Sequence, residues 1–421
     1  RRARPDRPPR PPGTRPRPRR SSPKENPMRV LVMTTPDPSH LPPLVPVAWA
    51  LRAAGHDVLV LGQPDSAESA RTAGLNFVCL GDWFRTEELV LRALAPGKRP
   101  LESRPRADPR MKGGFGGVWI EHAKDMAGTY LDFARAHRPD LILSDPLNYS
   151  ALIAGGVLGV PAVHHRWGVD PIGTPRLPAA RQELQATCQA LGLDALPDPA
   201  AVLDPCPTAL QLPELTGQTP LRYVPFNGSG TVPDWLRAEW GRPRTGPHRV
   251  VVSLGRRTLA YHGVPFTRTL LHALGELPDV ELLATVGAEH RQQIGPVPDA
   301  VRMVDPFPLH LALDSCDAIV THGGSATTMT AALHGLPQLA LPQMADCFAH
   351  GDRLAATGAG LTLDTVAAQD DPDQLRRSLT RLLTDPHHAE AAAALRQDME
   401  RMPTPAQTVG TLERLAGHRT R

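Results

Sequence analysis

The segment from Thr321 to Thr328 joins an apolar run to a helical pattern through two adjacent glycines. Residues 317–320 predict a strand, and residues 329–334 predict a helix that a Gly and a Pro close. Glycines let a ligand approach the backbone, and the unpaired N–H groups and positive dipole end of the next helix attract anions. We therefore expect an α/β unit that holds a phosphate group at this turn.

Side chains in the same segment add hydrogen-bond donors. His322 precedes Gly323 and Gly324, Ser325 is the expected N-cap of the helix, and Thr327 supplies another hydroxyl. A glycine pair alone would also suit an ordinary tight turn before a capped helix. Because an imidazole and hydroxyls accompany the glycines here, the pattern favours a diphosphate site.

The chain has 421 residues, of which 41% are hydrophobic, so it suits a globular protein of two domains. Residues 1–27 differ from the rest, with nine Pro and ten Arg or Lys against two acidic residues. This segment carries +8, which leaves −5 for the remainder of a chain whose net charge is +3. We expect a disordered tail, and whether it belongs to the native protein stays open. A nucleic-acid-binding arm is the alternative, but the tail lacks interleaved aromatic residues, so we expect no nucleic-acid partner.

The five cysteines are scattered without a CxxC pair, which favours neither a disulfide framework nor a zinc site. The longest apolar region, residues 141–163, is interrupted by Asp145, Pro146 and Asn148, so we expect no membrane span. No signal peptide is recognisable at the start. These observations predict a cytoplasmic protein without a bound metal.

Strand and helix patterns alternate along two stretches of the chain, which indicates two Rossmann-like parallel-sheet domains facing across a cleft. We expect an N-terminal domain over 28–234, a proline-bearing linker over 235–247 and a C-terminal domain over 248–400. Residues 401–421 should form a C-terminal helix or tail that packs back on the N-terminal domain. The expected strands are 29–33, 56–61, 77–80, 141–144, 162–164, 249–254, 280–286, 301–304, 318–321, 338–341 and 361–363. A helix is expected over 308–315, whereas residues 165–247 read as irregular.

Several ordered blocks resemble the GT-B glycosyltransferases that decorate macrolides and aromatic polyketides. The blocks are residues 39–58, 138–170, 222–236 and, most specifically, 316–360. The resemblance spans nearly all of residues 28–400. It implies transfer of a hexose from a nucleotide diphosphate to a hydroxyl of a hydrophobic natural-product aglycone, with inversion at the anomeric carbon and without a metal or other cofactor.

The resemblance also implies a general base. His40 follows the first strand and matches the histidine that the family uses to take the proton of the acceptor, a role that suits imidazole near neutral pH. Asp145 follows the strand 141–144, and we expect its carboxylate to accept a hydrogen bond from that imidazole. The alternatives are a solvated loop histidine and an Asp that caps the helix beginning near Asn148.

Three positions of the second domain bear on the donor. Asp346 matches the carboxylate with which the family holds sugar hydroxyls, although helix capping is the alternative. Cys347 replaces the usual Gln, and because a thiol is a weak hydrogen-bond partner, this replacement is consistent with a deoxysugar. Thr330 stands where relatives that use ribonucleotides tend to carry a Glu for the ribose hydroxyls. We therefore predict a thymidine diphosphate (dTDP) sugar as co-substrate.

Other donor contacts are expected from loops after strands. Phe307 is a candidate to line the thymine, and Ser253 and Gly255 are candidates to touch phosphate. Arg256 and Arg257 follow, where relatives often have small residues, and both a diphosphate contact and a solvated position stay open.

Aromatic residues are rare in this chain, at 4%, so their positions are informative. Trp83 and Phe84 form one group, Phe115 and Trp119 form another in a glycine-rich stretch, and His165 follows a strand. We expect them to bind the acceptor, although ordinary packing explains bulky residues equally well.

Other functions stay open at this point. The first βα turn lacks a GxGxxG pattern, which argues against an oxidoreductase. Attack by an aromatic carbon, a nucleotide-sugar epimerase of the same fold and a non-catalytic partner protein of the same fold are the alternatives. A helper protein or a homodimer is compatible with the sequence.

Overall fold

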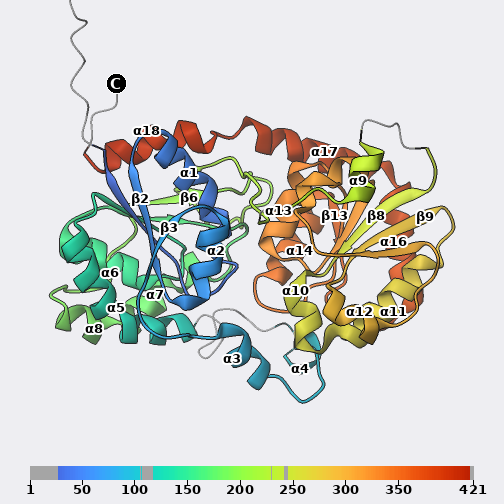
Figure 1. Ribbon diagram of the computed structural model, residues 1–421, viewed down its shortest axis with the longest axis horizontal. Coiled ribbons are helices and arrows are strands. Elements are labelled where there is room, and N and C mark those ends of the chain that lie inside the picture. Colours follow the sequence, from blue (N-terminus) through green and yellow to red (C-terminus); the bar gives the residue numbers. More distant parts are fainter. Residues whose placement is uncertain (1–26, 105, 107–116, 229, 241–244, 418–421) are drawn as a thin grey trace, which may run out of the picture.

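The computed structural model describes residues 27–104, 106, 117–228, 230–240 and 245–417, which form two domains side by side (Figure 1). Each domain contains one sheet, and every strand pair that is recorded in them is parallel. The predicted architecture of two parallel-sheet domains is confirmed. Most of the expected N-terminal tail, residues 1–26, lies outside the described residues, as does Phe115.

The N-terminal domain has a seven-stranded sheet in the order β3-β2-β1-β4-β5-β6-β7. Its strands are β1 (Arg29–Met33), β2 (Asp57–Gly62), β3 (Asn76–Cys79), β4 (Leu141–Ser144), β5 (Ala162–His165), β6 (Ala201–Asp204) and β7 (Thr219–Pro220). Its helices are α1 (Val45–Ala53), α2 (Ala67–Thr72), α3 (Thr86–Arg92), α4 (Pro100–Ser103), α5 (Gly117–His137), α6 (Tyr149–Leu158), α7 (Gly173–Glu183) and α8 (Gln185–Ala190). Apolar cores lie on both faces of the sheet, which is why β1 and β4 are almost continuously apolar.

The C-terminal domain has a six-stranded sheet in the order β10-β9-β8-β11-β12-β13. Its strands are β8 (His248–Ser253), β9 (Val280–Thr285), β10 (Val301–Val304), β11 (Ala318–Thr321), β12 (Gln338–Ala340) and β13 (Gly360–Thr362). Its helices are α10 (Gly255–Thr258), α11 (Val264–Gly275), α12 (Ala288–Ile294), α13 (Ser325–Leu333), α14 (Cys347–Thr357), α15 (Val366–Asp370), α16 (Pro372–Thr384) and α17 (Pro386–Arg401). α9 (Asp234–Glu239) precedes the first strand, and α18 (Pro405–Leu415) follows α17.

Strand order reverses beside the first strand of each sheet, between β1 and β4 and between β8 and β11. Ligands of doubly wound sheets bind at the carboxyl ends of strands at this reversal. The loops that follow these strands carry His40, Asp145, Gly255 and His322. The two candidate halves of the site therefore occupy the equivalent position in the two domains.

Two parts of the fold differ from the sequence-based expectation. The region expected to be irregular contains α7, α8, β6, β7 and α9. α7 forms although Pro178 lies inside it, because Leu177 and Ala180 are buried in the N-terminal core. The helix expected over 308–315 is a pair of 3₁₀ turns, Leu309–Leu311 and Leu313–Ser315.

The domains meet through an apolar cluster on one side of the cleft. Val169, Leu210 and Tyr223 of the N-terminal domain pack there against residues of α13, α14 and α17, including Met329 and Met399. α18 then returns to the N-terminal domain, where it packs against α1 (Figure 1). Its Val409 and Leu412 belong to the apolar core of that domain. Within the described residues, no helix is long and apolar enough to cross a membrane.

Candidate active site

The turn between β11 and α13, which we call the His322 turn (residues 321–325), is shaped by its glycines. Gly323 has φ +78°, and a Cβ atom there would lie 2.6 Å from the backbone oxygen of Cys347. Any other residue at this position would be destabilised for two reasons: its φ would be unfavourable, and its Cβ would clash with the Cys347 backbone. The main chain of the turn is consequently held against the start of α14.

His322 itself lies between two glycines. A Cβ on Gly255 would come within 2.7 Å of the imidazole, and a Cβ on Gly324 within 2.3 Å. Burial lowers the pKa of His322 to about 4, so the ring is neutral near neutral pH. A neutral imidazole has one N–H, and a hydrogen bond between this ring and the Ser253 backbone raises the pKa of His322 against the effect of burial. The N–H can donate to a phosphate oxygen only when it does not donate to that backbone group.

The N-cap of α13 corrects one expectation. Gly324, with φ −65° and ψ 141°, is the N-cap, and Ser325 is the first residue of the helix, without a capping hydrogen bond from a side chain. The main-chain N–H groups of Ser325, Ala326 and Thr327 have no acceptor within the helix, as in the first turn of any α-helix. Gly324 has no side chain that could accept from them, so no cap occupies these donors. An anion at this helix end would meet these donors directly.

Thr330, one turn further along α13, is fully buried and already has partners. Its hydroxyl donates to the Ala326 carbonyl at 2.6 Å and lies 3.2 Å from the Tyr223 hydroxyl. Asn227 donates to the same oxygen at 3.3 Å. Tyr223 and Asn227 belong to the segment that leads from the N-terminal domain to the linker, so this segment contacts α13 one turn after the His322 turn.

Asp346 and Cys347 begin α14. Asp346 is the N-cap but makes no capping hydrogen bond with its side chain, so helix capping does not occupy the carboxylate. Cys347 is buried, and burial raises the pKa of its thiol, which stays protonated. His350, one turn later, lies 3.7 Å from the Asp346 carboxylate and accepts a hydrogen bond from the Val169 N–H of the other domain at 3.1 Å.

The remaining donor-side candidates lie close to strand ends. Ser253, the last residue of β8, is buried and accepts a hydrogen bond from Thr285 at 3.2 Å. Phe307 packs edge-to-face on Trp235, with ring centroids 5.7 Å apart. Their positions are compatible with donor contacts, which stay predictions.

On the other side of the cleft, the loop after β1, which we call the His40 loop (residues 34–41), places an imidazole on an aromatic shelf. The His40 ring packs against Trp167 with centroids 4.0 Å apart and ring planes tilted by 31°, and the Trp119 centroid lies 5.6 Å away. His40 is only 9% exposed. Its Nδ1 forms a short hydrogen bond with the Thr35 hydroxyl.

Asp145 approaches His40 through Thr35, whereas the sequence had predicted a direct hydrogen bond. Its Oδ2 accepts from the Thr35 hydroxyl at 3.2 Å and from the Thr35 N–H at 2.7 Å, and its Oδ1 accepts from the Leu147 N–H at 2.9 Å. Burial raises the pKa of Asp145, against the lowering effects of His40 and of these donors. Hydrogen bonds thus connect Nδ1 of His40, through the Thr35 hydroxyl, to the buried carboxylate of Asp145.

Asp37 and Arg257 connect the two sides. The Arg257 Nη2 atom lies 2.6 Å from each carboxylate oxygen of Asp37. Burial alone would raise the pKa of Asp37, but His40 and Arg257 hold it well below its ordinary value. Arg257 is also close enough to His322 to lower the pKa of that imidazole. One guanidinium therefore binds a carboxylate of the His40 loop and lies near His322, so it connects the His40 loop with the surroundings of the His322 turn.

Two regions of the chain match a family described as Erythromycin biosynthesis protein CIII-like. Residues 49–255 match its N-terminal domain, and residues 268–415 match its C-terminal domain. The chain belongs to this family of GT-B glycosyltransferases.

Relatives of this glycosyltransferase extend over almost its whole length. TDP-daunosamine transferase DnrS of Streptomyces peucetius is 34% identical over 93% of this chain and 98% of its own. L-demethylnoviosyl transferase of Streptomyces niveus is 37% identical over 90% and 96%. The structure of spinosyn rhamnosyltransferase SpnG with thymidine diphosphate has a TM-score of 0.77 at 36% identity and covers 92% of this chain and 100% of that chain. Glycosyltransferase VinC in complex with dTDP has a TM-score of 0.76 at 30% identity, covering 93% and 100%.

The acceptor candidates of the glycosyltransferase lie at different depths. Trp119 is fully buried and stacks on Phe84, with centroids 5.7 Å apart, so these two rings form part of the shelf around His40. His165 is buried, with Nδ1 bonded to the Arg166 carbonyl at 2.6 Å, and burial lowers its pKa to about 4. Trp83 is 61% exposed. Their roles toward an acceptor stay predictions.

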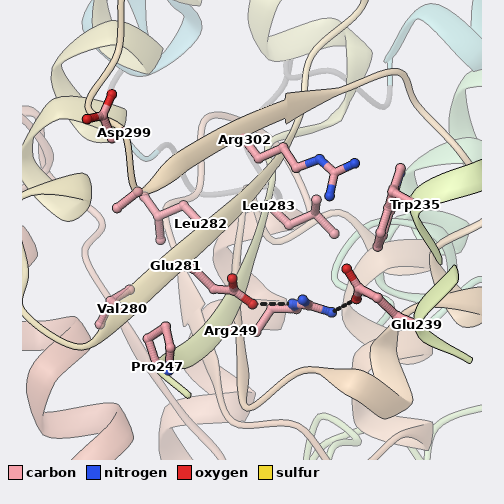
Figure 2. A pocket seen from close by; sticks show the side chains of 11 residues that line it. Trp235, Glu239, Pro247, Arg249, Val280, Glu281, Leu282, Leu283, Asp299 and Arg302 are labelled. Atoms are coloured by element: carbon pink, nitrogen blue, oxygen red, sulfur yellow. Dashed lines mark hydrogen bonds and ion pairs between the residues drawn. The ribbon is translucent and has the colours of Figure 1, made fainter. Parts of the chain in front are cut away.

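A hollow of about 340 Å³ in the C-terminal domain lies elsewhere, toward the amino ends of β8, β9 and β10 (Figure 2). Arg249 crosses it between Glu281, at 2.5 Å, and Glu239, at 2.7 Å. Arg302 lies over the ring of Trp235, 5.0 Å from its centroid. Because the candidate site lies at the carboxyl ends of the strands, this hollow is separate from it.

Sequence reasoning missed Thr35, and it left Arg257 undecided. The only available signal for Thr35 was its place in the loop that carries His40, because a threonine there has no pattern that identifies a partner 110 positions away. The partner of Arg257, Asp37, belongs to the other domain, and no sequence spacing relates the two.

Proposed function

We propose that this glycosyltransferase moves a deoxyhexose from a dTDP-sugar to a hydroxyl of a hydrophobic polyketide-type aglycone, with inversion. The names of relatives support the donor and acceptor classes, since they include TDP-daunosamine transferase and 3-alpha-mycarosylerythronolide B desosaminyl transferase. Thymidine diphosphate in a similar structure supports the nucleotide. The observation that carries the proposal is the ion pair of Arg257 with Asp37, which joins the His40 loop to the helix beside His322.

On the donor side, the diphosphate would bind at the N-terminus of α13. Its charge increases as the sugar departs, and the main-chain donors of Ser325 to Thr327 would stabilise it without reorganisation. His322, neutral because its pKa is about 4, would donate one more hydrogen bond when its N–H does not donate to the Ser253 backbone. These groups would stabilise the negative charge of the departing diphosphate, which a bound metal ion does in other enzymes. We therefore propose that transfer is independent of a metal ion.

On the acceptor side, His40 would act as the general base. When its Nδ1–H donates to the Thr35 hydroxyl, that hydroxyl can donate to Asp145, and Nε2 is left as an acceptor for the proton of the attacking hydroxyl. The carboxylate would stabilise the imidazolium that forms. The aromatic shelf of Trp167 and Trp119 keeps the ring in one orientation.

Sugar and nucleotide selection would rest on α13 and α14. The carboxylate of Asp346 makes no cap and is available to sugar hydroxyls. The buried thiol of Cys347 offers little to a hydroxyl, which fits a deoxygenated sugar. Thr330 holds its hydrogen bonds with Tyr223 and Ala326 and presents no carboxylate to a ribose 2′-hydroxyl. We therefore propose selection of dTDP over UDP.

Mass spectrometry of polyketide aglycones incubated with dTDP-deoxysugars tests the function. We expect a mass increase of one deoxyhexose residue, equal yields with and without EDTA, and lower yields with the matching UDP-sugar. Loss of activity in EDTA would refute metal independence. Preference for the UDP-sugar would refute the inference that Thr330, in place of a Glu, selects dTDP. Conversion of the sugar without any acceptor would indicate an epimerase.

A further inference from the structure

We propose that Arg257 is a positioning residue for the reaction: it ties the C-terminal domain to the His40 loop, so that the base is held in place only while the domains are closed. The inference rests on the proposed role of His40 and extends it to the opposite domain. Three sets of contacts carry it.

The first set lies within the His40 loop. Asp37 is fully buried, its backbone oxygen accepts from the His40 N–H at 3.0 Å, and its Oδ1 accepts from the Ser39 N–H at 2.9 Å and the Ser39 hydroxyl at 2.6 Å. The Asp37 carboxylate therefore fixes the turn that presents His40. Whatever holds this carboxylate also holds the imidazole.

The second set crosses the cleft. Arg257 binds both oxygens of Asp37 at 2.6 Å from α10, the helix that starts at Gly255, against which the His322 ring packs. A buried carboxylate that loses its cation is left with an uncompensated charge. Opening of the domains would separate this pair, and the His40 loop would lose the contact that balances Asp37.

The third set holds the other side of His40. Trp167 packs against its ring, and the next residues, Gly168 and Val169, contact His350 of α14. A Cβ on Gly168 would lie 2.6 Å from His350 Nε2, which shows how closely α14 approaches this loop. Two loops therefore hold His40: its own loop, which Arg257 attaches to α10, and the loop of Trp167, which His350 attaches to α14. Both helices border the proposed donor half of the cleft.

The neighbouring residue provides a matched control. Arg256 also pairs across the domains, with Glu87 at 2.6 Å, but its side chain is 66% exposed and, within the part of the chain that the structure describes, it forms no hydrogen bond or ion pair with the His40 loop. Exposed ion pairs contribute little to stability. Arg256→Met and Arg257→Met therefore remove the same charge from adjacent positions, and only the second releases Asp37.

The test compares four variants with the unchanged full chain: Arg257→Met, Arg257→Lys, Arg256→Met, and the double variant Asp37→Asn with Arg257→Met. Two quantities are measured: the dissociation constant for dTDP by calorimetry, and the rate at which diethyl pyrocarbonate modifies His40 in the presence of saturating dTDP, followed by peptide mass spectrometry. Where an acceptor is known, kcat is added.

For Arg257→Met we expect kcat to fall by roughly 10- to 100-fold, because small misplacements of reacting groups have effects of this size. His40 should be modified several-fold faster even at saturating dTDP, so this effect is separate from any weakening of dTDP binding caused by loss of the Arg257 charge near His322. Arg257→Lys should lose less kcat, because a single ammonium still balances the charge. Arg256→Met should match the unchanged protein in every measurement.

The double variant separates positioning from folding. It removes the unpaired carboxylate, so its melting temperature should exceed that of Arg257→Met, yet its kcat should stay low and its His40 reactive. Recovery of kcat together with stability would overturn the proposal, as would equal His40 modification rates in Arg257→Met and Arg256→Met. Failure of the unchanged protein to bind dTDP would instead refute the proposed function.

Discussion

The two halves of the cleft are built in different ways. The donor half is local: the His322 turn and the start of α13 are consecutive in sequence, and the main chain supplies most of the hydrogen-bond donors. The acceptor half is assembled, since His40 contacts Thr35 of its own loop and Trp167 from a distant one, and Asp145 lies behind Thr35. A local site depends on backbone conformation, whereas an assembled site depends on the packing of separate loops.

The two imidazoles, His322 and His40, also differ in the charged groups around them. His322 is made neutral by burial, without an acidic partner among the causes of its pKa shift. His40 lies near two buried carboxylates whose pKa values move in opposite directions, because Asp37 faces Arg257 whereas Asp145 faces only hydrogen-bond donors and His40. Substitutions in the donor half should therefore change nucleotide affinity, and those in the acceptor half should change turnover.

The largest effect should come from His40→Ala. Loss of a positioned general base lowers kcat by roughly 10²- to 10⁴-fold. Within the described residues, the recorded hydrogen bond and ring contacts of this imidazole are with Thr35, Trp119 and Trp167 and not with the His322 turn. The dTDP dissociation constant, measured by calorimetry, should therefore stay within about threefold. A parallel loss of nucleotide binding would mean that His40 maintains the structure of the cleft.

Gly323→Ala tests the donor half through its backbone alone. The positive φ and the 2.6 Å approach to the Cys347 oxygen should displace the turn and weaken dTDP binding by about 10- to 100-fold, which corresponds to 1–3 kcal/mol of strain. Gly74→Ala is the control, since Gly74 has φ +65° with nothing within 4 Å of its Cβ position. It should lower stability slightly and leave dTDP affinity intact. Equal affinities for the two variants would argue against a backbone cradle.

Thr35→Val tests the connection between His40 and Asp145. It removes one hydroxyl at nearly constant volume, so kcat should fall by about 3- to 10-fold, the value of one hydrogen bond. The adjacent Thr34 is a matched control, because its buried hydroxyl has no hydrogen-bond partner within the described residues. Thr34→Val should keep the kcat of the unchanged protein. If both variants lost activity equally, local packing would explain the effect.

The local half of the site could be predicted from sequence. A strand, two glycines and a helical pattern identify the His322 turn, because neighbours in sequence determine its geometry. Only the identity of the N-cap was wrong, since Ser325 favours that position by type whereas the actual cap, Gly324, is set by close packing against His322.

The assembled half could be predicted only in part. His40 and Asp145 could be located through the resemblance to the family, and the position of each after an apolar strand fits the carboxyl edge of a sheet. The order of the strands brings the loops after β1 and β4 together, but it does not say which side chain lies between them. The role of Thr35 follows from how the loops after β1 and β4 pack within the N-terminal domain, and the pairing of Asp37 with Arg257 follows from how the two domains meet. No local pattern encodes either arrangement.

The smallest expected effects are on stability. They distinguish Asp37 from Asp145, because folding lowers the pKa of Asp37 and raises the pKa of Asp145. The folded-state pKa of Asp37 lies below its unfolded value, so its ionisation stabilises the protein above the unfolded pKa, and this contribution is lost as pH falls through the acid range toward the folded value. Asp37→Asn should therefore lower the melting temperature by a few degrees at pH 7, and the difference should shrink at pH 3. For Asp145 the folded-state pKa is raised, so its ionisation opposes folding above the unfolded pKa, and Asp145→Asn should lower the melting temperature less at pH 7 than Asp37→Asn does. Melting curves of both variants at the two pH values check this order, and an equal loss at pH 7 would show that the charge of Arg257 does not distinguish the two sites.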